Sequence, residues 1–366
     1  MTLLVFILVF GGMVFLHEFG HFIVARWFKI EVEEFGFGFP PKIMTLFKWQ
    51  GTEFTLNALP LGGFVRPKGE NDPNVLDGLA AANPWKRLGV LFAGPLMNLL
   101  TSVVVMALII AQTGIAVPGK VLIENVSAAS PAEAGGLRPG DQIVSIGGQS
   151  VTTVEASRAA IRASLDLPLE VVVLRQEAQV KLSVTPLSSR PAEQGALGVG
   201  LSYPRRPATV GEIVGGGFTY TGIQAFSILY TPIGLIQGAI APESARFIGM
   251  KGIYDLFGQA VARDTESRQA AQTSPGAAGV PAQQPTNYIL YMVAMLSVSL
   301  AVLNLLPIPA LDGGRILFTL PEILFRRRIP YKLENVINGV AFLLLIGLMI
   351  FINAMDFINP ANIQLP

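Results

Sequence analysis

Long apolar runs, separated by shorter polar stretches, dominate the pattern of this chain of 366 residues. A membrane-spanning helix needs about 20 predominantly apolar residues. Four runs reach that length, and they cover residues 3–24, 88–111, 288–306 and 336–355. The pattern therefore predicts a polytopic α-helical membrane protein with about four transmembrane helices.

Basic residues predict how these helices are oriented. Lys and Arg gather between the first and second runs and again after the third run, whereas residues 1–16 and 356–366 contain neither. Loops rich in Lys and Arg stay on the cytoplasmic side. We therefore expect both termini, and the connection over residues 112–287, to lie outside the cytoplasm. The first run lacks the positively charged start and the small-residue cleavage site of a secretory signal peptide. We therefore expect it to be retained as a transmembrane helix.

The connection after the second run is long enough to hold a folded domain. Residues 117–187 contain short β-rich runs such as LEVVVLR and VKLSVTP, with a helical stretch near 153–165. The string SPAEAGGLRPGDQIVSIGGQSV resembles a PDZ domain. We therefore expect one inserted extracytoplasmic PDZ domain over residues 112–190, and another small β-sandwich is the alternative.

Two further parts of this connection differ from residues 117–187 in composition and pattern. Residues 191–262 contain the apolar stretch 208–241, which includes Glu212, a glycine triplet and Pro232. We expect an amphipathic, interfacial segment there, because a fifth span would invert every later segment and place FRRRIPYK outside. Residues 263–287 lack apolar periodicity and predict a flexible linker.

A strand-like pattern follows the first apolar run. Residues 30–65 alternate by face, with KWQGT as the turn, and predict a β-hairpin on the cytoplasmic side. The first domain, residues 1–111, would thus hold two helices and this hairpin, and residues 288–366 would hold the last two helices. Such a hairpin could pair with an extended peptide by β-augmentation, and we expect Thr52–Leu59 to supply the pairing edge.

Composition limits the partners and the metal ligands that this chain can have. The chain is 51% hydrophobic and 14% charged, with a net charge of +1, and basic patches of the kind that bind nucleic acid are missing. It has no cysteine, which excludes disulfides, thiolate ligands and a cysteine nucleophile. A metal site must therefore use His, Asp or Glu.

The only two histidines of the chain lie within the first apolar run, in HEFGH. His17 and His21 are four residues apart, so a helix places them on one face. This is the H-E-x-x-H pattern, in which two imidazoles bind zinc and the glutamate, here Glu18, is the general base. Unpaired polar residues are costly in lipid, which favours a metal site over packed histidines.

A catalytic zinc takes three protein ligands and keeps one position open. Asp312, in LNLLPIPALDGGRILF, is the only acidic residue between Tyr288 and Leu320. It follows a helix broken by prolines, at the same predicted depth as the two histidines. We expect Asp312 to be the third ligand, and a helix N-cap is the alternative.

These motifs resemble the site-2 protease family of intramembrane zinc metalloproteases, in the branch of the bacterial regulator of sigma-E protease. The resemblance covers essentially the whole chain and rests on HEFGH, NLLPIPALDGG and the predicted PDZ domain. It implies one zinc ion held by His17, His21 and Asp312, with Glu18 as the catalytic base. Members of this branch commonly carry two PDZ domains, whereas this sequence shows one.

The resemblance also implies substrate contacts at two asparagines. Asn304 lies in the N-x-x-P-x-P-x-L-D-G string, and Asn98 lies in AGPLMN, which is similar to the family's G-P-x-x-N motif. On the residues alone, each asparagine is as well explained by a hydrogen bond between helices.

The function implied is regulated intramembrane proteolysis in the bacterial inner membrane, with the hairpin as the family's re-entrant element. Substrates would be single-span membrane proteins already cut outside the membrane, such as anti-sigma factors, or leftover signal peptides. The PDZ domain would exclude substrates that keep a large extracytoplasmic domain. The alternatives are a membrane-bound adaptor with a structural zinc and a metal transporter.

Overall fold

The computed structural model describes residues 2–189, 195–240, 248–273 and 287–359. The chain divides into two compact units. The helical unit comprises Met1–Ile109, Gly211–Glu266 and Asn287–Pro366, and the β-rich unit comprises Ile110–Val210 and Ser267–Thr286. Along the chain, both segments of the β-rich unit therefore lie between segments of the helical unit.

Among the described residues, four helices are long and apolar enough to cross a membrane: α1 (Thr2–Trp27), α2 (Pro84–Thr113), α7 (Tyr288–Leu305) and α9 (Tyr331–Ile358). They match the four predicted spans within a few residues at each end. None of the most apolar window of α9 is buried within the protein. An apolar helix surface of this kind is suited to lipid rather than to water.

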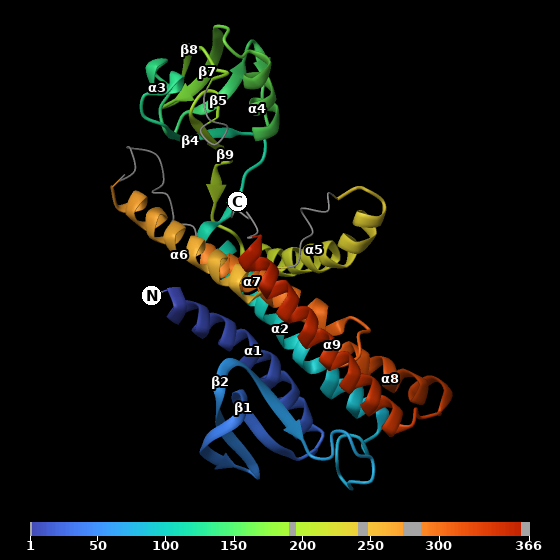
Figure 1. Cartoon of the computed structure of the whole chain (residues 1–366). Helices are drawn as coiled ribbons and strands as arrows, with labels where there is room; N and C mark the ends of the chain where they lie inside the picture. Colours follow the sequence, from blue (N-terminus) through green and yellow to red (C-terminus); the bar gives the residue numbers. More distant parts are fainter. Residues whose placement is uncertain (1, 190–194, 241–247, 274–286, 360–366) are drawn as a thin grey trace. The chain divides into compact units, whose positions relative to one another are not determined.

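β1 (Val32–Trp49) and β2 (Thr52–Pro67) form the predicted hairpin beside α1 (Figure 1). The turn residues Gln50 and Gly51 both have positive φ, at 46° and 89°, as a two-residue type I′ turn requires. The hairpin packs on α1 through an aromatic cluster. The cluster contains Phe15, Phe19, Phe22, Phe35, Phe37 and Phe54.

The register of the hairpin corrects the expected pairing edge. Phe54 has partners at both Phe35 and Phe47. Neighbouring residues of the first half of β2 are likewise flanked by the two halves of β1. Repeated register shifts curve the long strands, so the first half of β1 covers this part of β2 on its second side. Residues 53–56 therefore lie inside the sheet, and the expectation that Thr52–Leu59 forms an edge is wrong for this central part.

The β-rich unit contains an antiparallel sheet with strand order β8-β7-β5-β4-β9, with β6 paired to β5. Its strands are β4 (Val121–Val126), β5 (Gln142–Ile146), β6 (Gln149–Ser150), β7 (Leu169–Arg175), β8 (Ala178–Val184) and β9 (Val199–Ser202). Two helices, α3 (Pro131–Ala134) and α4 (Val154–Ala163), accompany the sheet. Valine, isoleucine and leucine side chains from both layers form one buried core.

This sheet extends beyond the expected domain boundary at residue 190. Strand β9 pairs with β4, and Leu197 lies in the core. Next to it, β10 (Arg205–Arg206) pairs with β3 (Ile115–Ala116), so the two ends of the unit meet. The boundary was misplaced because VGLS is too short to show an alternating pattern.

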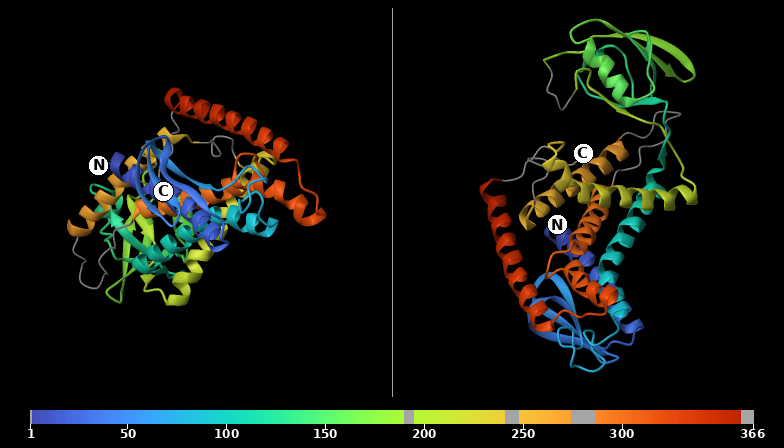
Figure 2. Two further views of the ribbon diagram at one scale, coloured as in Figure 1. Left: turned by 90° about the horizontal axis from the view of Figure 1, so that it is seen from below. Right: turned by 90° about the vertical axis from the view of Figure 1, so that its right-hand side faces the viewer.

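α5 (Val210–Ile236) is one continuous helix through the glycine triplet and Pro232. It is not among the four candidate spans, and it runs across α2 rather than along it (Figure 2). Gly217 lies against the Val103 carbonyl, which an added Cβ would overlap. One turn further, the Thr221 hydroxyl is 3.0 Å from that of Ser102.

α6 (Met250–Thr273) overlaps the predicted linker. Residues 263–273 are helical, so that part of the linker prediction is wrong, and residues 274–286 lie outside the described residues. Arg, Glu, Gln and Ala are good helix formers, which explains the continuation of the helix. Asp264 is buried and accepts the backbone N–H of Tyr288 at 2.6 Å, which joins α6 to the start of α7.

Candidate metal centre

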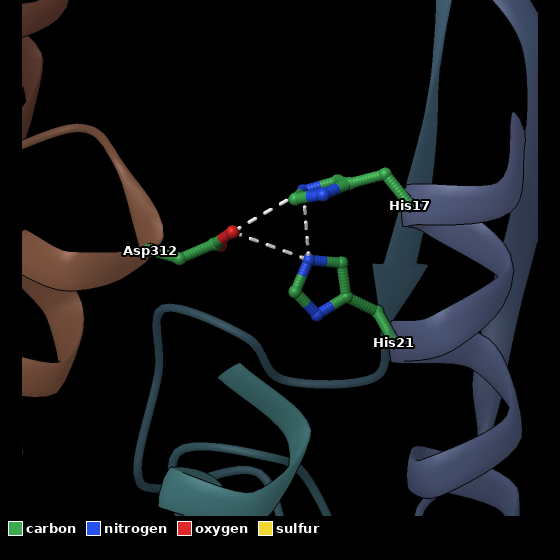
Figure 3. Close-up of side chains that lie close together, drawn as sticks. All are labelled: His17, His21 and Asp312. Atoms are coloured by element: carbon green, nitrogen blue, oxygen red, sulfur yellow. Dashed lines mark hydrogen bonds and ion pairs between the residues drawn. The ribbon is translucent and has the colours of Figure 1, made fainter. Parts of the chain in front are cut away.

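α1 presents the two histidines to one another. His17 and His21 are one helical turn apart, and their Nε2 atoms are separated by 3.3 Å. The rings meet edge to face, with centroids 4.8 Å apart. His17 is buried, at 6% exposure. Both imidazoles therefore turn toward the interior of the unit (Figure 3).

α8 (Asp312–Phe325) brings the carboxylate to this pair. Asp312 Oδ2 lies 3.2 Å from His17 Nε2 and 3.4 Å from His21 Nε2. The N-cap of α8 is Leu311, and Asp312 is the first helical residue, so the alternative of a capping aspartate does not describe this side chain.

The break between α7 and α8 depends on glycine. An added Cβ at Gly313 would overlap the carbonyls of Leu305 and Leu306. At Gly314 it would overlap the carbonyl of Ile308. The first turn of α8 can therefore fold back on the end of α7 only because both residues lack a side chain, and this fold-back directs Asp312 toward α1.

The three donor atoms fit a zinc ion. In a tetrahedral site with bonds of about 2.0–2.1 Å, any two ligand atoms are about 3.3 Å apart. The three separations here are 3.2, 3.3 and 3.4 Å. Two imidazole nitrogens and one carboxylate oxygen are ordinary zinc donors, and three ligands leave the fourth position for substrate or water.

Backbone and amide groups contact the outer nitrogens of both imidazoles. His21 Nδ1 is 2.7 Å from the carbonyl oxygen of Val90. His17 Nδ1 is 3.1 Å from the side-chain nitrogen of Asn98. Partners at this position orient a metal-binding histidine and fix its tautomer.

The other predicted asparagine, Asn304, lies at the edge of the His17 ring that faces Asp312. Asn304 Nδ2 is 3.3 Å from His17 Nε2, one of the three donor atoms. Asn304 is half-buried, whereas Asn98 is completely buried. The structure thus brings both predicted asparagines to the same imidazole, from opposite edges of the ring.

Glu18 turns toward the hairpin. Its Oε2 accepts the backbone N–H of Val65, on β2, at 3.0 Å. Gly63 lies close by, since a Cβ built there would be 3.7 Å from Glu18 Cγ. The position of this carboxylate is therefore set by a backbone group of β2.

Three contributors to the site were missed from sequence. Gly94 packs under His21, and an added Cβ would overlap the imidazole ring. Val90 and Val65 act through backbone atoms, which give no signal in a motif. The glycine of AGPLMN was the one available signal, because a glycine within an apolar helix marks a close approach.

Ion pairs attach α8 to the neighbouring segments. Arg87 of α2 contacts Glu322 at 2.9 Å and donates to the Thr319 hydroxyl at 3.2 Å. Nearer to Asp312, Arg315 pairs with Glu70, in the segment that follows β2. These contacts hold the helix that carries Asp312 against both α2 and the end of the hairpin.

Comparison with known proteins agrees with this geometry. The model for Peptidase family M50 matches residues 5–348. A protein of Clostridium perfringens named "Putative zinc metalloprotease" is 32% identical over 357 residues, covering 97% of this chain and 98% of its own. A Mesorhizobium japonicum protein with the same description is 31% identical, covering 96% and 97%. The chain therefore belongs to peptidase family M50, the site-2 proteases, and is a zinc metalloprotease of the membrane.

Proposed function

We propose that this protease holds one zinc ion through His17, His21 and Asp312, and that it cleaves the transmembrane segments of single-span membrane proteins. The observation that carries the proposal is the triangle of donor atoms, built from α1 and from the α7–α8 break. Both lie at candidate membrane-spanning helices, where a soluble substrate would not reach. The reaction class is metal-assisted hydrolysis of a peptide bond.

Glu18 is the general base of this reaction. Zinc held by the three donor atoms would supply Lewis-acid chemistry, polarising the peptide carbonyl and making water more acidic. Glu18 accepts a proton from the attacking water, whose oxygen bonds to the carbonyl carbon, and then delivers that proton to the leaving nitrogen. Val65 holds Oε2, so Oε1 is the oxygen we assign to proton transfer.

Asn304 is the group best placed to stabilise developing charge on the carbonyl oxygen. Its amide nitrogen is a donor on the inner side of His17. Donors that are fixed before the reaction contribute most when they face the oxygen that gains charge. We therefore retain Asn304 as the substrate-binding asparagine.

The hairpin supplies a route for an unwound substrate. A helical substrate hides its carbonyl in a hydrogen bond, so it must become extended before attack. Each of residues 63–67 of β2 has a single register partner, in the first half of β1, and Val65 approaches Glu18. We propose that the substrate pairs with this edge by β-augmentation.

Cross-linking tests this edge, because the chain has no cysteine of its own. In a Glu18→Gln background, which retains uncut substrate, Arg66→Cys should form a disulfide with a cysteine near the scissile bond. Met44→Cys, on the opposite side of the hairpin, is the matched control. Equal cross-linking at both positions would contradict pairing at residues 63–67.

The second half of β1 supports a re-entrant position for the hairpin. It exposes large apolar side chains: Ile43, Met44, Leu46, Phe47 and Trp49. The two lysines among them, Lys42 and Lys48, both pair with Glu53, at 2.7 and 2.5 Å. Pairing lowers the cost of placing these charges near lipid. We propose that this half of the strand dips into the bilayer.

We assign the β-rich unit as a PDZ domain outside the cytoplasm of the bacterial inner membrane, on the same side as both termini. The positive-inside pattern and the string SPAEAGGLRPGDQIVSIGGQSV support this placement. The domain excludes substrates that keep a large extracytoplasmic part. Substrates are therefore membrane proteins already cut once, such as anti-sigma factors, or signal-peptide remnants.

The rival from another class is an adaptor whose zinc is structural. A structural site closes its coordination with four protein ligands, and among the described residues the group contains His17, His21 and Asp312 alone.

One reconstitution separates the two functions. Wild type and Glu18→Gln are placed in vesicles with a single-span substrate that lacks its outer domain, and zinc content is measured alongside cleavage. We expect one zinc in each protein and a rate about 10²–10⁴-fold lower in the variant. If both bind zinc and neither cuts a panel of such substrates, the adaptor is the correct reading.

A further inference from the structure

Asn98 occupies a position that its expected role in substrate binding does not explain. The residue lies on α2, one turn after Gly94, and its side chain is completely buried. Its amide lies 3.1 Å from His17 Nδ1, the ring nitrogen that faces away from Asp312. A substrate held at the donor triangle would meet the opposite edge of this ring.

The donor triangle dictates which nitrogen of His17 carries the proton. Nε2 is the atom within 3.2 Å of Asp312 Oδ2, so Nε2 must offer its lone pair to a metal. A neutral imidazole has one N–H, and that N–H is then on Nδ1. His21 shows the completed arrangement, because its Nδ1 lies 2.7 Å from the carbonyl oxygen of Val90.

His17 lacks the matching acceptor while the amide nitrogen of Asn98 faces it. In that orientation two donors, Nδ2 and Nδ1–H, point at one another, and the buried Oδ1 of Asn98 has no hydrogen-bond partner among the described residues. A buried acceptor without a partner costs about 1–3 kcal/mol. Turning the amide by 180° places Oδ1 against Nδ1–H and satisfies both atoms.

We propose that Asn98 is a positioning residue for the metal centre: its Oδ1 accepts the Nδ1–H of His17, which fixes the tautomer and the ring plane that leave Nε2 free to bind zinc. The inference rests on the zinc site proposed above and replaces the substrate contact expected for this asparagine. Removing such a partner typically lowers metal affinity 10–100-fold.

Zinc affinity of the full chain in detergent, measured by competition with a chelator, tests the proposal. Asn98→Leu keeps the shape and removes the acceptor, so we expect affinity to fall 10–100-fold. Asn98→Asp keeps an acceptor and has no donor, so affinity should stay within a few-fold of wild type. Ser102→Ala is the matched control, because Ser102 is buried one turn further along α2 and bonds to Thr221 instead; its zinc affinity should be unchanged.

Nitrogen NMR provides a readout that activity does not. The chain has two histidines, so ¹⁵N-histidine labelling gives signals from His17 and His21 alone. In the zinc-loaded wild type and in Asn98→Asp, the protonated Nδ1 of His17 should carry a slowly exchanging hydrogen. In Asn98→Leu that hydrogen should exchange faster, while the Nδ1 signal of His21 is unchanged.

Two outcomes overturn the inference. If Asn98→Leu binds zinc as tightly as wild type but has a raised KM, Asn98 contacts substrate. If Asn98→Asp loses as much affinity as Asn98→Leu, acceptance by Oδ1 is not its role. Failure of the proposed function looks different, since a wild type that binds zinc and cuts nothing would leave these affinity differences intact.

Discussion

Gly94 lies under the ring of His21, where an added Cβ would overlap the imidazole. Gly20, on the other helix, similarly allows the backbone of Ala93 to approach α1. This close contact places the carbonyl of Val90 and the amide of Asn98 beside the two rings. The metal centre therefore depends on the absence of side chains as well as on the donors themselves.

We expect Gly94→Ala to weaken zinc binding at least about 10-fold, because the methyl group displaces His21 from its partner Val90 and so disturbs an outer hydrogen bond of a ligand. Chelator competition measures the effect. Gly12→Ala is the matched control, since a Cβ at this α1 position meets nothing within 4 Å. Similar zinc affinities in the two variants would contradict the steric argument.

Single residues differed in how far sequence could predict them. HEFGH identified His17, Glu18 and His21 because helical spacing is a local property. Asp312 followed from the scarcity of acidic residues at membrane depth, and the structure brings it to the histidines. The neighbour of Asn98 could not be inferred, because it depends on how α2 packs on α1.

α8 carries Asp312 and is attached to the rest of the helical unit by charged side chains. The side chain of Arg87 is 7% exposed and that of Glu322 is 21% exposed. Breaking a buried pair by removing one partner is costly, and without Arg87 the Glu322 carboxylate would keep the more distant Arg328, whose Nε is 3.9 Å away. The position of Asp312, the proposed third ligand, therefore depends on an ion pair outside the candidate metal site.

We expect Arg87→Met to lower the free energy of unfolding by about 3 kcal/mol, measured by denaturation in detergent without zinc. Arg87→Met combined with Glu322→Met should regain part of this loss, since the carboxylate that has lost its nearer cation is also removed. Lys251→Met, which breaks an exposed pair with Asp255, should cost less than about 0.5 kcal/mol. Equal losses of unfolding free energy in Arg87→Met and Lys251→Met would show that the buried pair stabilises the protein no more than the exposed one.

Elements with strong periodicity were predicted well, and short or weakly patterned ones were not. The four long apolar helices and the hairpin turn were predicted correctly because length and turn chemistry are visible locally. Strand β9 was missed because its pairing with β4 is non-local. The polar end of α6 was taken for a linker because its helix lacks an apolar stripe, although its residues favour helix.

The β-rich unit is an insertion whose two ends are paired. β3 and β10 form a two-stranded ladder, and the backbone N–H of Val117 donates to the carbonyl of Pro204 at 2.8 Å. The unit also has its own buried core. It can therefore be exchanged without altering the order of the residues that form the metal centre.

Replacing residues 118–203 with a short Gly-Ser linker tests the proposed size filter. We expect the shortened protein to keep its zinc affinity and to cut substrates that retain a large extracytoplasmic domain, which wild type leaves intact. Cleavage is followed by gel mobility in vesicles. A substrate without that domain is the control and should be cut equally by both proteins. If neither the wild type nor the shortened protein cuts the large substrate, the replaced residues are not the size filter.

Two of the contacts around the metal centre are made by main-chain atoms, the Val65 N–H to Glu18 and the Val90 carbonyl to His21. Their chemistry is identical for nearly every amino acid, so saturation mutagenesis should report residues 65 and 90 as tolerant wherever the new side chain fits. Proline is the exception at both positions: at 65 it has no N–H to donate, and at 90, inside α2, its ring would clash with the preceding turn of the helix. Residues 65 and 90 can therefore differ between related sequences while their backbone geometry stays the same. A comparison of amino-acid identities alone then misses part of what the active site requires.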